Sequence, residues 1–155
     1  MKIRRAEIGD IKDINRLLCQ VLEVHHKGRP DIFKGGAKKY TDNEILEIIA
    51  DNNRPIFVAD VDGDILGYAF CVFEQKLDNN ILTDIKTLYI DDLCVDEASR
   101  GNGIGRTLYD FVTHFAKENG CYNLTLNVWA CNESALAFYK KCGLKNQKIG
   151  MEKIL

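Results

Sequence analysis

A single stretch, residues 90–108, constrains what this chain can fold into more than any other. It starts as an apolar run, passes through a short polar turn and carries Gly101, Gly103 and Gly105 just before an amphipathic segment. Because glycine lets the backbone bend sharply and approach a ligand closely, this order predicts a strand, a glycine-rich turn and a helix. The free N–H groups of a first helical turn, backed by the positive end of the helix dipole, bind phosphate. The stretch therefore predicts a phosphate-binding turn.

Two familiar glycine loops are excluded by counting residues. The dinucleotide pattern G-x-G-x-x-G and a P-loop that starts at Gly101 both need glycine at position 106, where the chain has Arg106. Arg100 and Arg106 instead flank the loop and add positive charge that suits a pyrophosphate. The alternative is a tight strand-to-helix connection in which the glycines serve only the turn.

The order Arg-Gly-Asn-Gly-Ile-Gly at residues 100–105 resembles the R/Q-x-x-G-x-G/A motif of the GNAT (Gcn5-related N-acetyltransferase) family. In that family the motif holds the pyrophosphate of acetyl-coenzyme A. The resemblance thus implies a coenzyme-binding loop made of Arg100, Gly101, Asn102, Gly103, Ile104, Gly105 and Arg106. It also implies that the backbone of the preceding strand pairs with the pantetheine arm, as an added strand would, at Leu93, Cys94 and Val95.

The resemblance covers most of the chain and implies one α/β (α+β) domain over residues 1–155. It implies a mixed, mostly antiparallel sheet of about six to seven strands, flanked by about four helices, with a splay between the fourth and fifth strands. Apolar spacing places strands at 3–5, 55–60, 65–73, 81–95, 122–128 and 148–155. It places helices at 8–25, at 41–51, from 104 to the Asn119-Gly120 pair, and from 132 to Gly143.

Two local features complete the predicted fold. Asp10 is expected to cap the first helix, and Asp62-Gly63 is a hairpin signal between two strands. Residues 25–36 contain Pro30 and several glycines, which predicts a loop. In GNAT folds the corresponding segment walls the acceptor site; the alternative is a solvated connection.

Two adjacent carboxylates, Asp91 and Asp92, interrupt the apolar strand before the glycine loop. Successive strand residues face opposite ways, so at most one points to the cleft unless a bulge intervenes. Burial raises the pKa of a carboxylate, which suits a base. The pair is similar to Glu-Asp in polyamine-acetylating relatives, which implies Asp91 as the base, directly or through water. In the histone-acetylating branch the glutamate lies where this chain has Tyr89.

Other roles for these groups stay open at this point. Asp91 could be paired with an arginine or lysine, or be exposed, and the amine could be activated by water without a dedicated base. His25 and His26 could serve as a base or contact the acceptor, but the sequence identifies no partner that would complete a triad.

A proton donor is predicted near the end of the chain. Residues 132–143 resemble the family segment N-x-x-A-x-x-F-Y-x-x-x-G-F, although Leu144 replaces the last phenylalanine. In the family the tyrosine, here Tyr139, faces the coenzyme sulfur and can protonate the leaving thiolate. Asn132 matches the asparagine that contacts the coenzyme, a role compatible with helix capping. The alternative for Tyr139 is a core residue beside Phe138.

Composition excludes several classes of protein. A formal net charge of −2 without a dominant basic stripe argues against a nucleic-acid partner. The chain has no run of about 18 apolar residues, so no membrane span is expected. The first residues lack the apolar region of a signal peptide. Six cysteines are scattered without a C-x-x-C pair, which favours a reducing cytoplasm and predicts no metal site.

These observations combine into one functional prediction, an acetyl-coenzyme A-dependent N-acetyltransferase. A primary amine is expected to attack the thioester directly in a ternary complex. The acceptor is expected to be a small amine such as a polyamine, aminoglycoside or amino acid, with a protein N-terminus or lysine as the alternative. Two rival hypotheses are a non-catalytic sensor of acyl-coenzyme A and a nucleotide-binding regulator. Family members are often dimers, so a homodimer is compatible with the resemblance.

Overall fold

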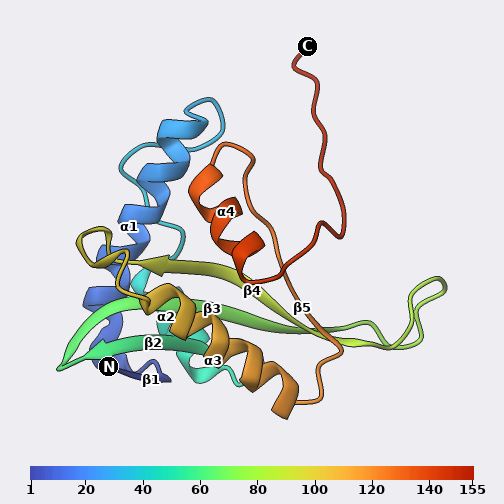
Figure 1. The fold of residues 1–155 in the computed structure, drawn as a ribbon, viewed down its shortest axis with the longest axis horizontal. Coiled ribbons are helices and arrows are strands. Elements are labelled where there is room, and N and C mark those ends of the chain that lie inside the picture. The colour runs from blue at the N-terminus through green and yellow to red at the C-terminus, as the bar shows by residue number, and fades with distance from the viewer.

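A five-stranded mixed sheet runs through the molecule in the order β1-β2-β3-β4-β5 (Figure 1). The structure is a computed structural model and describes residues 1–155. Its strands are β1 (Lys2–Arg5), β2 (Ile56–Val61), β3 (Asp64–Gln75), β4 (Lys86–Val95) and β5 (Asn123–Leu126). The pairs from β1 to β4 are antiparallel, whereas β4 and β5 are parallel. The predicted mixed, mostly antiparallel sheet is thus confirmed.

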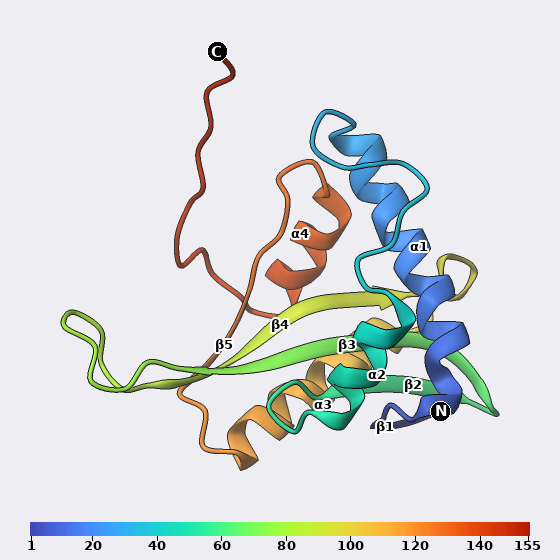
Figure 2. The same ribbon diagram turned by 180° about the vertical axis from the view of Figure 1, so that it is seen from behind.

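Four α-helices cover the sheet, as predicted. They are α1 (Ile11–Gly28), α2 (Asp42–Ala50), α3 (Ile104–Glu118) and α4 (Glu133–Lys141). α3 lies in front of the sheet in Figure 1, and the view from behind in Figure 2 shows α1 and α2 over the opposite face. Each face has its own apolar core, one with Leu17 and Ile48 from α1 and α2, the other with Leu108 and Val112 from α3. This arrangement buries the apolar stripes of α1, α2 and α3 against the sheet, whereas α4 has no fully buried residue.

Local sequence signals for turns and caps account for several element boundaries. The Thr41 hydroxyl accepts a hydrogen bond from the Glu44 N–H at 3.2 Å and begins α2. Asp62 and Gly63 both have positive φ, at 56° and 97°, which is the geometry of a two-residue hairpin turn between β2 and β3. Gly120, with a φ of 70°, follows the end of α3.

The parallel pairing of β4 with β5 is short. It runs only from Thr87 opposite Asn123 to Ile90 opposite Leu126, after which β4 continues to Val95 without β5. The predicted splay between the fourth and fifth strands is therefore confirmed. The edge of β4 beyond Ile90 that faces away from β3 has no neighbouring strand.

The predicted strand at residues 148–155 is wrong, and the sheet has five strands rather than six to seven. This segment joins no ladder, and the side chains of Ile149, Met151 and Ile154 are exposed. In Figure 1 the chain after α4 runs away from the sheet. An alternating apolar pattern indicates that a segment can form a strand, but it does not supply the partner whose backbone groups must pair with it.

Two other predicted boundaries need correction. The strand predicted from residue 81 begins at Lys86, because Asn79 Oδ1 accepts the N–H groups of Ile81 and Leu82 at 3.0 Å each and prolongs the turn. Asp10 does not cap α1 with its side chain. Its carboxylate accepts two hydrogen bonds from the Arg4 guanidinium instead, at 2.7 and 2.9 Å. Two hydrogen bonds from a charged guanidinium group are stronger than one hydrogen bond from a backbone N–H.

Candidate functional site

The glycine loop between β4 and α3 exposes unpaired backbone donors. Gly101 and Gly103 have φ angles of 83° and 80°, a conformation that other residues rarely adopt. Gly103 immediately precedes α3, and the first hydrogen bond of the helix runs from the Thr107 N–H to the Gly103 carbonyl at 3.0 Å. The N–H groups of residues 104–106 have no acceptor in the protein. Unpaired N–H groups of this kind, at the positive end of a helix dipole, are able to bind an anion.

Gly105 allows α3 to lie close to its neighbours. A Cβ atom there would be 3.4 Å from Val95 Cγ2 and 3.6 Å from the Phe138 ring. The side chain would thus contact both β4 and α4, between which the start of α3 fits. The third glycine of the motif therefore serves packing, whereas Gly101 and Gly103 serve the turn.

The two flanking arginines lie exposed beside this terminus. Arg100 Nε donates to the Val95 carbonyl at 3.2 Å, and Arg106 Nε contacts the Asp110 carboxylate at 2.9 Å one helical turn further on. Asn102 donates to the Ser99 carbonyl at 3.3 Å within the loop. The residues present fit a pyrophosphate, since free N–H donors lie at the start of α3 and an exposed arginine lies on either side of them.

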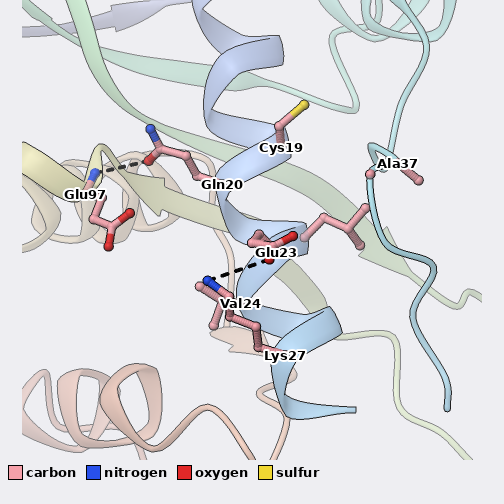
Figure 3. Close-up of a pocket in the computed structure, with 9 residues that line it drawn as sticks. Cys19, Gln20, Glu23, Val24, Lys27, Ala37 and Glu97 are labelled. Atoms are coloured by element: carbon pink, nitrogen blue, oxygen red, sulfur yellow. Dashed lines mark hydrogen bonds and ion pairs between the residues drawn. The ribbon is translucent and has the colours of Figure 1, made fainter. Parts of the chain in front are cut away.

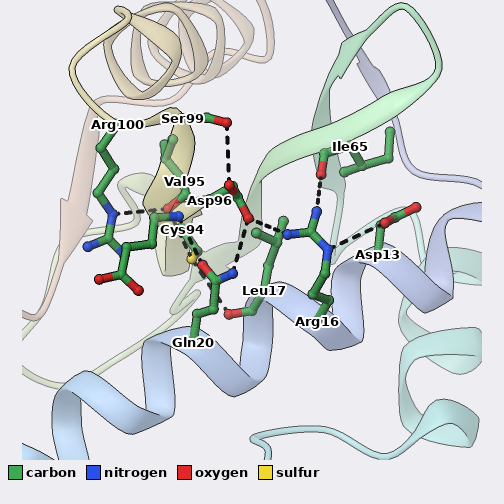
Figure 4. Close-up of polar contacts among 11 residues, drawn as sticks. Asp13, Arg16, Leu17, Gln20, Ile65, Cys94, Val95, Asp96, Ser99 and Arg100 are labelled. Atoms are coloured by element: carbon green, nitrogen blue, oxygen red, sulfur yellow. Dashed lines mark hydrogen bonds and ion pairs between the residues drawn. The ribbon is translucent and has the colours of Figure 1, made fainter.

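Asp96, which sequence reasoning missed, anchors the beginning of the loop to α1 (Figure 4). Its buried carboxylate pairs with Arg16 and accepts hydrogen bonds from Gln20 Nε2 at 3.1 Å and from Ser99 Oγ at 3.3 Å. The hydrogen bond from Gln20, followed by that from Arg16, lowers the pKa of Asp96. Arg16 also donates to the Ile65 carbonyl at 2.9 Å, so one guanidinium ties together α1, β3 and the loop.

The predicted coenzyme-facing backbone lies on the splayed end of β4. Leu93, Cys94 and Val95 pair with β3 opposite Ala69, Tyr68 and Gly67, and none of them pairs with β5. The Cys94 side chain is buried against α1, with its sulfur 3.6 Å from the Leu17 carbonyl. The backbone edge of this segment that points away from β3 is therefore available to an added strand.

A β-bulge brings both adjacent carboxylates to the same face of β4. Phe70 pairs with Asp92 and Cys71 with Ile90, which leaves Asp91 as the extra residue without a partner on β3. Asp91 and Asp92 then contact Tyr40 and Tyr68, whose side chains both belong to the α1–α2 side of the sheet. The bulge thus meets the condition under which two successive strand residues can serve one site.

Asp91 is not a free carboxylate. It accepts a hydrogen bond from the Tyr40 hydroxyl and forms an ion pair with Lys39, whose Nζ lies 2.9 Å from Oδ2. Lys39 Nζ also donates to the main-chain oxygen of Asp91 at 3.1 Å. Burial, followed by the hydrogen bond to Asp91, raises the pKa of Tyr40, so this phenol keeps its proton. Of the alternatives that the sequence left open for Asp91, the structure contains the ion pair with a lysine, which is Lys39.

Asp92 lies deeper and has a different environment. The fully buried Tyr68 donates to Asp92 Oδ2 at 2.9 Å. Burial raises the pKa of Asp92 to about 6, against the lowering effects of Lys39 and Tyr68. A carboxyl group with such a pKa exchanges its proton near neutrality, which suits general base chemistry.

Tyr139 presents a proton donor from α4. The residue is half-buried, its ring contacts Phe138 edge-on at 5.2 Å between centroids, and its hydroxyl has no hydrogen-bond partner in the protein. Burial, followed by the negative charge of Asp92, raises the pKa of Tyr139 well above its ordinary value. The phenol therefore stays protonated at neutral pH. Asn132 begins the same helix and accepts the Ala135 N–H at 3.2 Å, so its capping role is confirmed.

The loop predicted at residues 25–36 begins only after Gly28, because α1 continues through His25 and His26 to that residue. The Phe33 ring lies 5.0 Å from the His25 ring and 4.9 Å from the Trp129 ring, so it bridges α1 and the segment after β5. His26 Nδ1 holds the Phe33 carbonyl at 2.7 Å. Burial and the charge of Lys39 lower the pKa of His25, which keeps that imidazole neutral. Neither histidine contacts Asp91 or Asp92.

Two surface pockets lie away from these groups. One of about 400 Å³ lies between α1 and Ala37 and includes the Glu23–Lys27 ion pair at 3.6 Å (Figure 3). In the same view Gln20 Oε1 accepts the Glu97 N–H at 3.0 Å. A second, of about 360 Å³, lies along the β4–β5 ladder. Neither is lined by Asp91, Asp92 or Tyr139, so pocket size does not identify the chemistry here.

Sequence reasoning missed the side chains that surround the carboxylates. Lys39 and Tyr40 lie in the connection before α2, and Tyr68 lies among apolar residues on β3. Adjacent aspartates in an apolar strand signal that polar partners must lie nearby, since buried charges are paired or hydrogen-bonded. The sequence thus indicates that the two aspartates need polar partners, but it does not indicate which residues of the chain these partners are.

Comparisons with known proteins agree with this geometry. A family model described as "Acetyltransferase (GNAT) family" matches residues 21–144. The chain is 29% identical to the glucosamine 6-phosphate N-acetyltransferase of Arabidopsis thaliana, over 98% of this chain and 95% of that protein. It is 27% identical to an N-alpha-acetyltransferase of Sulfurisphaera tokodaii, over 96% and 82% of the two chains. A crystal structure of a mutant BH1408 protein from Bacillus halodurans superimposes with a TM-score of 0.96 at 32% identity, over 100% and 99% of the two chains.

Two further observations concern membranes and metals. No helix is both long and apolar enough to cross a bilayer. No group of three or more His, Cys, Asp or Glu side chains is placed to hold a metal ion.

Proposed function

This chain belongs to the acetyltransferase (GNAT) family and is an acetyltransferase, and on that premise we propose that it moves an acetyl group from acetyl-coenzyme A to the primary amine of a small molecule. The observation that carries the proposal is the bulge in β4. It places Asp91 and Asp92 on one face of the strand, at the point where β4 parts from β5. A pair of carboxylates there can both attract an ammonium group and accept its proton.

The coenzyme-binding residues are proposed from the two parts of the site that fit it. Acetyl-coenzyme A supplies the acetyl group as a thioester. The unpaired N–H groups of residues 104–106, with Arg100 and Arg106, support the binding of its pyrophosphate. The free edge of residues 93–95 supports strand-like pairing with its pantetheine arm. Asn132 is proposed as a further contact, beyond its capping role.

The proton-accepting group is proposed to be the carboxylate pair. Asp91, the predicted base, already holds an ammonium group, that of Lys39, at 2.9 Å. Burial raises the pKa of Asp92 to about 6, so this carboxylate can accept a proton near neutral pH. We assign ammonium binding and first contact to Asp91, and final acceptance of the proton, directly or through water, to Asp92. Two adjacent groups with different surroundings can thus divide a task that one carboxylate performs less well.

Tyr139 is proposed as the acid for the departing thiolate. Its hydroxyl has no partner in the protein, and burial raises its pKa, so it carries a proton at neutral pH. A thiolate is a good leaving group and needs only a weak acid. The charge of Asp92 acts on Tyr139, which supports placing base and acid in one site.

The acceptor is proposed to be a compact amine such as an amino sugar or an aminoglycoside. The Phe33 bridge between α1 and the segment after β5 narrows the approach to the carboxylates, which favours small molecules over a protein chain. Relatives are named for glucosamine 6-phosphate and for N-alpha acetylation, so both acceptor classes belong in the test. A protein N-terminus is the second candidate, because an extended peptide can enter beside a free strand edge.

Thiol release from acetyl-coenzyme A across a panel of amines tests the proposal. The panel contains glucosamine 6-phosphate, an aminoglycoside, spermidine, free amino acids and a short peptide with a free N-terminus. Amine-dependent release that is lost in an Asp91→Asn, Asp92→Asn double variant supports acetyl transfer at this site. Tight coenzyme binding without release for any amine favours a sensor. Calorimetric preference for ATP over coenzyme A contradicts the assignment of the loop to the coenzyme.

A further inference from the structure

One primary amine of the chain itself lies at the proposed acceptor position. Lys39 Nζ is 2.9 Å from Asp91 Oδ2 and 3.1 Å from the main-chain oxygen of the same residue. It is the one lysine or arginine whose side chain contacts either Asp91 or Asp92. The ammonium group therefore engages the bulge through both a carboxylate and a carbonyl, which are the acceptors that an incoming amine would need.

The surroundings of Lys39 hold this amine without enclosing it. Its neighbour Tyr40 donates to the same carboxylate, and the Tyr40 ring stacks on Phe70 at 5.3 Å between centroids. The Lys39 side chain nevertheless remains 39% exposed. Tyr40 thus fixes the end of the loop on β4, and the amine beside it stays accessible from the cleft.

We propose that Lys39 is a self-acetylation site, modified by the same centre in which it lies when no external amine competes. The inference rests on the proposed function, because it requires that the carboxylate pair activates amines. A lysine ammonium bound at Asp91 has the same chemistry as the ammonium of a small acceptor. Its tether to the chain gives it a high effective concentration there.

The reaction is an ordinary acyl transfer in which atoms balance. The bond that forms joins Lys39 Nζ to the acetyl carbonyl carbon, and the bond that breaks is the C–S bond of the thioester. The ammonium loses two protons in total. One goes to the Asp91–Asp92 pair, which exchanges it with water, and the other leaves on the thiol of coenzyme A. No oxidant, reductant or further reactant is required.

Acetylation at this position changes the site that produces it. An acetylated lysine carries no charge, so the ion pair with Asp91 is lost and the carboxylate keeps only the hydrogen bond from Tyr40. The modification therefore removes a competitor for Asp91. A chain acetylated at Lys39 should bind external amines more tightly than an unmodified chain.

Lys38 provides a matched internal control. It is the adjacent lysine, its side chain is 33% exposed, and it also pairs with a carboxylate, that of Asp42 at 2.6 Å. Its partners are Asn15 and Asp42, both on helices rather than on β4. Acetylation by reagent diffusing in solution should treat the two lysines alike, whereas acetylation by the site should select Lys39.

The test incubates the whole chain with acetyl-coenzyme A and no acceptor, then locates the added acetyl group by mass spectrometry of peptides. Lys39 should be acetylated at least about tenfold faster than Lys38, because one amine is held at the centre and the other is not. The rate per molecule should not change on dilution of the protein, as an intramolecular reaction requires. Asp91→Asn should lower the acetylation rate of Lys39 to that of Lys38. Asp42→Asn should leave the acetylation rate of Lys39 unchanged.

A second measurement needs no coenzyme. The side-chain nitrogen NMR signal of Lys39 should be resolved as that of a held ammonium group in the free protein. This signal should disappear in Asp91→Asn and persist in Asp42→Asn. Its absence from the unmodified chain contradicts the placement of the amine, whatever the rates are.

The outcomes separate this inference from the proposed function. Equal acetylation of Lys38 and Lys39, in a preparation that releases thiol with an added amine, overturns self-acetylation and leaves acetyl transfer standing. An absence of thiol release with every amine, together with an unmodified Lys39, overturns both. Selective, dilution-independent modification of Lys39 supports both.

Discussion

The phenol of Tyr68 donates a hydrogen bond of 2.9 Å to the carboxylate of Asp92 from within the apolar core. This single contact satisfies the buried hydroxyl and orients the carboxylate on the bulged segment of β4. It does not compensate fully for burial, since the pKa of Asp92 is still raised to about 6. The carboxylate is thus held in place at a cost in stability, as is common for functional groups.

The first prediction concerns stability. Because the pKa of Asp92 is raised from 3.8 to about 6, folding opposes its ionisation, and the cost of the charge grows as the pH rises from about 4 to 6 and is constant above that. Asp92→Asn keeps an acceptor for Tyr68 and removes the charge. It should stabilise the protein by about 2–3 kcal/mol at neutral pH, measured by urea unfolding, and by much less near pH 4. An equal gain at both pH values would contradict the raised pKa.

The second prediction concerns the pH dependence of turnover. If Asp92 accepts the proton, kcat/KM for a good acceptor should fall as the pH drops below about 6, since the base is then protonated. Rates of thiol release measured between about pH 5 and 8 give this profile. Asp91→Asn should raise KM for the amine and move the acid limb to lower pH, because the charge of Asp91 helps to raise the pKa of Asp92. If the fall in kcat/KM at low pH persists unchanged in Asp92→Asn, the base is a group other than Asp92.

The third prediction concerns Tyr139. Replacing it with phenylalanine keeps the ring beside Phe138 and removes the hydroxyl. Thiol release should slow by roughly a hundredfold or more, because the leaving thiolate loses its acid. The affinity for coenzyme A, measured by calorimetry, should be unchanged. Tyr109→Phe is the matched control, since Tyr109 also contacts Phe138 but belongs to the core of the α3 face. Equal rates in both variants would remove Tyr139 from the mechanism.

The fourth prediction concerns the anchor of the glycine loop. Hydrogen bonds from Gln20 and Arg16 lower the pKa of Asp96, so its contribution to stability is present above an ordinary pKa near 3.8 and is lost as the pH falls below it. Asp96→Asn should cost about 1–3 kcal/mol at neutral pH and weaken coenzyme binding. The difference from the unmodified chain should shrink only as the pH falls below about 4, toward the lowered pKa of the folded carboxyl group.

An exposed ion pair gives the control for that measurement. Arg106 and Asp110 lie one turn apart on α3, with side chains 57% and 53% exposed. Asp110→Asn should leave the unfolding free energy nearly unchanged, because ion pairs in solvent contribute little. Similar losses in Asp96→Asn and Asp110→Asn would indicate that the anchor has no special role.

The features that the sequence predicts well are local ones. Glycines 101 and 103 take the positive φ angles that only glycine adopts readily, so the turn and the start of α3 follow from adjacent residues. Asn132 caps α4 through its own side chain, so that helix start also follows from adjacent residues. The mixed sheet and its splay between the fourth and fifth strands followed from the family resemblance and not from the residues alone.

The features that sequence reasoning missed depend on partners far apart in the chain. Tyr40 and Asp91 are 51 residues apart, and Arg16 and Asp96 are 80 residues apart, so no spacing rule connects them. The predicted strand at 148–155 failed for the converse reason. Its apolar residues are a local signal, but pairing needs a second strand, which local residues do not specify.

The bulge at Asp91 also fixes the phase of the whole strand. Leu88 and Ile90 before it, and Leu93 and Val95 after it, all face α3, although ordinary alternation would assign the second pair to the opposite side. Deleting Asp91 would close the bulge and leave a regular ladder in which these four side chains still face α3, because Phe70 already pairs with Asp92 and Cys71 with Ile90. The extra residue therefore gives the strand a second carboxylate beside Asp92 without turning the apolar side chains or moving the glycine turn that follows them.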